Sequence, residues 1–220
     1  MKFLLLLIAL LVLGRFSAFA KSSATITFSL DFPNSDPEHY SISVQSDGRA
    51  KYQSSAKLSK DSQENQNYQA DFTLSAATRS RIFDLAKQAH YFDGKVDSGN
   101  KKLAFTGAKK LAYQDGQYST TAEYNFSQEP PVQQLTALFQ SMAATLEFGR
   151  RLVYYHRYQK LALDDELKRM ESQAHNGELA ELQAVKPILQ DVYDDRAVIK
   201  VVRARALRIM EMGNNTQPAH

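Results

Sequence analysis

The sequence predicts an α+β fold, with a small antiparallel sheet and one packed helix followed by a helical, bundle-like C-terminal half. Three observations support this prediction. Apolar and polar residues alternate in the first part of the chain, as they do in half-buried strands. Two Asp-Gly pairs, at residues 47–48 and 115–116, separate such runs and are typical of hairpin turns. After Pro130-Pro131, apolar residues recur every three or four positions, as on the buried side of a helix.

The N-terminal segment, residues 1–20, has the organisation of a cleavable secretory signal. Lys2 supplies a positive charge, residues 3–13 are apolar without interruption, and the segment ends in Ala-Phe-Ala, which suits signal peptidase. An uncleaved anchor would need about 20 apolar residues, and Arg15 interrupts the run before that length. We therefore expect an exported protein, periplasmic or extracellular and of bacterial type. The mature chain should start at Lys21 and have no transmembrane segment.

The charge balance and the absence of cysteine exclude several classes of function. The chain has 27 Lys and Arg, 24 Asp and Glu, and no cysteine. Loss of the signal removes Lys2 and Arg15, which leaves 25 basic residues against 24 acidic ones. This balance lacks the positive excess that drives binding to nucleic acid, so no nucleic acid is expected as a partner. The missing cysteines exclude disulfides, thiol catalysis and cysteine-ligated zinc, and they fit a bacterial exported protein.

Four strands are expected before the first helix, at residues 24–30, 40–44, 50–52 and 68–74. The polar residues 54–67 are expected to form a loop. Ser75 can cap a helix that runs to about His90, because a serine hydroxyl accepts hydrogen bonds from the free N–H groups of the first turn. Two more β-prone runs, residues 111–113 and 118–126, flank the second Asp-Gly turn and complete the predicted sheet.

The change of period divides the mature chain into a β-rich α+β domain, residues 21–131, and a helical region, residues 132–212. Residues 213–220 are expected to be a disordered tail. A single apolar stripe at helical spacing predicts the first long helix. The stripe consists of Leu135, Leu138, Phe139, Met142, Leu146, Gly149, Val153 and His156.

Three more helices are expected after it. An aspartate at residues 164–165 can cap the second helix, which should end at Asn176-Gly177. The third should cover residues 179–192 with a bend at Pro187, since proline removes a helical hydrogen bond. The fourth should cover residues 196–212. Its expected core residues are Val198, Val201, Val202 and Ile209.

The first half also resembles a known group of proteins. The residues concerned are Tyr40-x-Ile42-x-Val44-x-x-Asp47-Gly48-x-x-x-Tyr52, Leu74-Ser75 at a helix start, and the second Asp-Gly hairpin. This pattern resembles a family of uncharacterised secreted bacterial α+β domains and covers about residues 24–145. The resemblance implies export and fold but no activity. Members of that family often have cysteines near the first strand, whereas this chain has none.

The densest group of polar and aromatic residues lies at 150–158. Spacings of three, four and seven place the candidate binding residues on one helix face: Arg151, Tyr154, Tyr155 and Tyr158. Arginine with tyrosine suits contact with a carbohydrate, a peptide or a partner protein. The alternative is structural, with the tyrosine rings covering the sheet and the arginines left in solvent.

His156 joins this group as a candidate binding residue and as the basis of an enzyme alternative. A general base needs a nucleophile within reach and a carboxylate to orient it. The sequence has no Gly-x-Ser-x-Gly or Ser-x-x-Lys motif to supply the nucleophile. A buried, hydrogen-bonded structural histidine is the competing interpretation. The histidines are scattered along the chain, so neither a metal site nor a cofactor is expected.

These observations favour a non-catalytic extracytoplasmic binding or scaffold module whose partner is a protein or an envelope component. Two alternatives remain. One is a secreted hydrolase that uses His156 with a carboxylate. The other is an anionic-polymer binder that uses the basic residues of the last helix, against the interpretation that these residues form the solvated side of that helix. Those basic residues are Lys200, Arg203, Arg205 and Arg208.

Overall fold

The computed structural model of the chain describes residues 23–56 and 66–215. The predicted signal segment, its cleavage site and residues 216–220 of the predicted tail lie outside the described residues. The strands are β1 (Thr25–Asp31), β2 (His39–Gln45), β3 (Arg49–Ala56), β4 (Gln66–Thr73), β5 (Ala108–Gln114) and β6 (Ser119–Tyr124). The α-helices are α1 (Ala76–Gln88), α2 (Pro130–Tyr158), α3 (Leu163–His175), α4 (Lys186–Asp194) and α5 (Lys200–Asn215). Short 3-10 turns occupy His90–Phe92, Lys160–Ala162 and Leu182–Val185.

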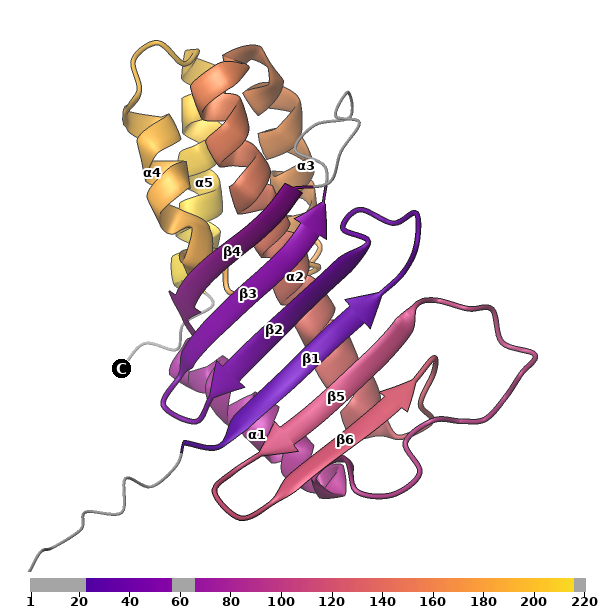
Figure 1. Ribbon diagram of the computed structural model, residues 1–220. Helices are drawn as coiled ribbons and strands as arrows, with labels where there is room; N and C mark the ends of the chain where they lie inside the picture. Colours follow the sequence, from indigo (N-terminus) through magenta and orange to yellow (C-terminus); the bar gives the residue numbers. More distant parts are fainter. Residues whose placement is uncertain (1–22, 57–65, 216–220) are drawn as a thin grey trace, which may run out of the picture.

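The six strands form one antiparallel sheet in the order β4-β3-β2-β1-β5-β6, and helices make up the C-terminal half (Figure 1). The predicted α+β fold is confirmed. β1 lies in the middle, where Phe28 is opposite Ile42 of β2 and Leu111 of β5. The first Asp-Gly pair makes the β2–β3 turn, in which Gly48 has a φ of +95° that favours glycine. The chain reaches β5 from β4 through α1, whose first turn is capped by the Ser75 hydroxyl as predicted.

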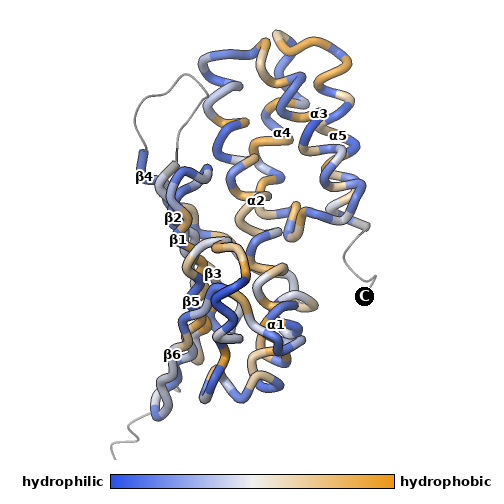
Figure 2. Tube along the Cα trace, turned by 90° about the vertical axis from the view of Figure 1, so that its right-hand side faces the viewer, coloured by the Kyte–Doolittle hydropathy of each residue, from blue (hydrophilic) through white to orange (hydrophobic). Residues whose placement is uncertain are grey.

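α1 and the first half of α2 cover the same face of the sheet, which Figure 2 shows edge-on. The alternate residues of the strands that face these helices are buried. Phe139 of α2 stacks on Phe28 of β1, with ring centroids 5.3 Å apart and planes inclined by 8°. At 29 residues, α2 is roughly 43 Å long at 1.5 Å per residue. It is therefore long enough to cross the sheet and continue into the bundle with α3, α4 and α5 (Figure 1).

The buried side of α2 is not the single stripe that the sequence predicts. Up to Leu146 the predicted residues face the core, but Val153 is 52% exposed. Phe148, Leu152 and Tyr155 are buried instead. The partner of the helix changes along its length, from the sheet to the other helices, and these lie against different sides of α2.

The C-terminal helices differ from the prediction at their ends. α3 starts at Leu163, so residues 164–165 lie in its first turn and provide no cap. The predicted third helix is interrupted rather than bent, because Pro187 occupies the first turn of α4, where its missing N–H costs nothing. α5 starts at Lys200, after a turn in which the Asp195 carboxylate accepts from the Ala197 N–H.

Three local expectations are also wrong. Val201 is exposed on α5 rather than buried. α5 continues to Asn215, so the first three residues of the predicted tail are helical. The ends of the predicted 54–67 loop belong to strands, because β3 reaches Ala56 and β4 begins at Gln66. No described helix is both long enough and apolar enough to cross a membrane.

Candidate functional site

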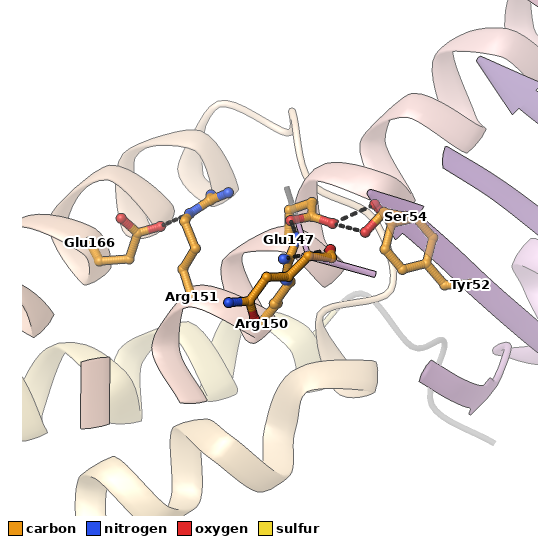
Figure 3. Close-up of polar contacts among 7 residues, drawn as sticks. Tyr52, Ser54, Glu147, Arg150, Arg151 and Glu166 are labelled. Carbon is orange, nitrogen blue, oxygen red and sulfur yellow. Dashed lines mark hydrogen bonds and ion pairs between the residues drawn. The ribbon is translucent and has the colours of Figure 1, made fainter. Parts of the chain in front are cut away.

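Two charged side chains are buried where α2 passes the end of β3 and β4. Glu147 is 3% exposed and Arg150 is 4% exposed. The Glu147 Oε1 accepts hydrogen bonds from the Tyr52 hydroxyl at 2.8 Å and from the Ser54 hydroxyl at 2.6 Å (Figure 3). Arg150 Nη1 lies 3.3 Å from the other oxygen of Glu147, and its Nη2 donates to the carbonyl of Gln66. Burial and the nearby Glu147 raise the pKa of Tyr52. This network joins the helix to the sheet.

A second buried carboxylate, from α3, contacts α2 next to this network. Glu166 of α3 is fully buried, and Arg151 Nε donates to its Oε1 at 2.7 Å (Figure 3). Arg169, three residues after Glu166, forms an ion pair with Oε2. The Arg151 guanidinium also lies 4.9 Å from the centroid of the Phe148 ring. Glu166 thus orients two guanidinium groups, one from α2 and one from α3.

These two arginines line a cleft of about 360 Å³. One wall is the β1–β2 connection, residues 32–38, and the other walls are α2 and α3. The apolar lining consists of Leu30, Phe32, Pro37, Tyr40, Ala143, Ala144 and Phe148. Arg151 and Arg169 provide charge on the helical side, together with the amides of Gln140 and Gln173. An apolar pocket with a few converging polar groups is the usual form of a small-molecule site.

The predicted binding residues do not form one exposed face. Arg151 lines the cleft, and Tyr155 is buried beside α3. Tyr154 is half-buried and lies 5.7 Å from the Tyr155 ring and 5.3 Å from the Tyr158 ring. Tyr158 is 63% exposed. Burial raises the pKa of Tyr155, and the nearby Glu166 raises it further. Arg151 is therefore the one predicted site residue that reaches the cleft.

His156 lies outside the cleft and faces the α4–α5 connection. Its Nε2 is 2.9 Å from Asp195 Oδ2, which also accepts from Lys160. The hydrogen bond from Lys160, followed by one from the Ala197 N–H, lowers the pKa of Asp195 to about 2. Within residues 23–56 and 66–215, no hydroxyl group is hydrogen bonded to His156. The same described ranges contain no group of three His, Cys, Asp or Glu residues placed to hold a metal ion.

We expect His156→Gln to lower the melting temperature by a few degrees without removing an activity. The change weakens the contact between α2 and the α4–α5 connection, whereas Lys160 still holds Asp195. The measurement is thermal unfolding at pH 7, with His175→Gln at the exposed end of α3 as the control. An unchanged melting temperature, combined with loss of a hydrolytic signal on a panel of esters and peptides, would favour the hydrolase instead.

The basic residues of the last helix are largely engaged within the protein. Arg205 forms ion pairs with Asp164 and Glu171 of α3, and Arg208 pairs with Glu171. Arg203 donates to the carbonyl of Tyr193. Arg205 and Arg208 hold α5 on α3, Arg203 holds it on α4, and these contacts leave less free positive charge than the sequence suggests.

Three residues of this region are not among the site residues predicted from the sequence: Glu147, Glu166 and Arg169. The sequence does show one pattern for these residues: Glu147 with Arg150, and Glu166 with Arg169, are opposite charges three residues apart on predicted helices. Such pairs are common on exposed helix faces, so the burial of the two glutamates could not be inferred. No model of a known protein family matches the chain, and no curated protein matches it.

Proposed function

We propose that this protein is a non-catalytic extracytoplasmic binding module and that its ligand occupies the cleft between the β1–β2 connection, α2 and α3. The observation that carries this proposal is the pair of guanidinium groups oriented by the buried Glu166 beside an apolar lining. Holding a fully buried carboxylate is costly unless it is paired. The two arginines that pair with this carboxylate both line the same cavity.

Export is inferred from the signal-like residues 1–20, and a partner from the cell envelope follows from that location. The resemblance of residues 24–145 to secreted bacterial α+β domains agrees with it. The His156–Asp195 pair offers the hydrolase alternative its carboxylate, but the histidine lies outside the cleft. A binding role therefore accounts for more of the geometry than a catalytic one does.

The test uses the full chain produced in an exporting bacterium. We expect the periplasmic fraction to contain a protein whose intact mass corresponds to a chain beginning at Lys21. We also expect native mass spectrometry to detect a small ligand that copurifies with it. Ala144→Trp fills the cleft from α2 and should reduce ligand occupancy at least tenfold. Ala204→Trp, on the exposed surface of α5, is the matched control.

Thermal unfolding of both variants shows whether each is folded. A folded Ala144→Trp protein that retains the ligand as the wild type does would show that the cleft is not the binding site. Recovery of the uncleaved chain from the membrane fraction would contradict the proposed export.

A further inference from the structure

The positive and negative charges are distributed unequally between the two sides of the cleft, with Arg151 and Arg169 on the helical side and Asp36 on the opposite wall. Arg151 binds Glu166 through Nε and Arg169 binds it through one terminal nitrogen, so a single carboxylate faces two guanidinium groups. Among the described residues, the remaining guanidinium N–H groups of these two arginines form no hydrogen bonds. Asp36 on the opposite wall is exposed and forms no ion pair with any described residue. One positive charge on the helical side therefore lacks a direct counter-ion within the part of the chain that the structure describes.

The other negative side chain of the cleft cannot supply that counter-ion. Glu147 also lines the cavity, but Arg150 and the hydroxyls of Tyr52 and Ser54 already bind its two oxygens. Its position is fixed by the junction between the sheet and α2. Hence the free donors of Arg151 and Arg169 are available to an anion that enters from solvent.

The apolar lining extends beyond the cleft at one edge. Phe32 packs edge-to-face against Phe105, with ring centroids 5.9 Å apart. Phe105 is 56% exposed, although it comes from a different connection, the one that leads into β5. Two aromatic rings from separate loops thus form an apolar border opposite the arginines. A ligand that covers this border needs an apolar chain or ring.

We propose that the cleft binds a small organic monocarboxylate with an apolar chain or ring. This inference rests on the proposed function and names its ligand class. Planar guanidinium groups bind carboxylates through two parallel N–H donors, which favours a carboxylate over a neutral hydroxyl or amide. Glu166 fixes both groups before the ligand arrives, so little side-chain entropy is lost on binding. The single excess positive charge on the helical side favours one carboxylate, and the cavity of about 360 Å³ is at the small end of ligand pockets.

The experiment compares 1-naphthylacetate with its neutral analogue, 1-naphthaleneethanol, by fluorescence anisotropy. The chain contains no tryptophan, so the naphthalene signal can be excited selectively. We expect the wild-type protein to bind the carboxylate about tenfold more tightly than the alcohol, which is the gain that a charged hydrogen bond provides. Arg169→Gln should reduce carboxylate affinity to the level of the alcohol while leaving alcohol binding unchanged.

Lys168→Gln is the matched control, because it removes the same charge from an exposed position next to Arg169. It should leave both affinities unchanged. Equal loss of carboxylate affinity in Lys168→Gln and Arg169→Gln would show a general charge effect and overturn the inference. Equal affinity of the wild type for both compounds, abolished by Ala144→Trp in isothermal titration calorimetry, would overturn the carboxylate preference but retain the cleft as a binding site. If neither compound binds, the ligand class is wrong, and the copurification test still decides the proposed function.

Discussion

Replacing Glu147 by alanine is expected to lower the free energy of unfolding by about 3–5 kcal/mol. The side chain accepts from Tyr52 and Ser54 and pairs with Arg150. Its removal leaves a buried guanidinium without its carboxylate and two hydroxyl donors without that acceptor. The loss should appear as a lower midpoint in urea unfolding with an unchanged slope.

The control for this substitution is Glu211→Ala, an exposed glutamate of α5 that should change the midpoint very little. The paired replacement Glu147→Leu with Arg150→Met should cost less than the sum of the two single changes, because it removes both charges together. A midpoint for Glu147→Ala equal to that of Glu211→Ala would mean that the buried network does not stabilise the protein.

Replacing Phe139 by alanine is expected to cost about 3–5 kcal/mol, the range for truncating a buried aromatic side chain. Phe139 is fully buried and stacks on Phe28 at the centre of the sheet. The cavity would lie between α2 and β1, where the rigid sheet limits how far the neighbours can relax. Chemical denaturation followed by circular dichroism measures the loss.

Val153→Ala provides a sharp comparison on the same helix. The periodicity of the sequence places Val153 and Phe139 on one buried stripe, whereas the structure exposes Val153. We expect Val153→Ala to change stability by less than about 0.5 kcal/mol, as surface substitutions do. Equal costs at the two positions would contradict the described change in the buried side of α2.

The sheet and α1 could be predicted because their signals are local. Alternation selects strands, an Asp-Gly pair permits the positive φ of a tight turn, and Ser75 satisfies N–H groups at the start of α1. The predicted 50–52 strand was nevertheless too short. Ser54 is polar and therefore suggests a loop, but its hydroxyl donates a hydrogen bond to Glu147, which makes burial at the end of β3 possible.

The candidate site was predicted only through Arg151. Nothing near Glu147 in the sequence indicates that its partners are Tyr52 and Ser54, more than 90 residues earlier. His156 likewise meets Asp195 rather than the nearer acidic residues 164–166. Charged side chains have low intrinsic preference for burial, and their burial depends on partners that only the packed chain supplies.

The sequence by itself determined the α+β class, the order of strands and helices along the chain, and the helix cap at Ser75. These features depend on contacts within a few residues. The tertiary structure decided which side of α2 is buried, which carboxylates are enclosed, and how the β1–β2 connection, α2 and α3 form the cleft. Those features depend on contacts between residues far apart in the chain. Each feature depends on the balance between the free energy gained by apolar burial and the free energy lost by desolvating charges. That balance depends on how the whole chain packs.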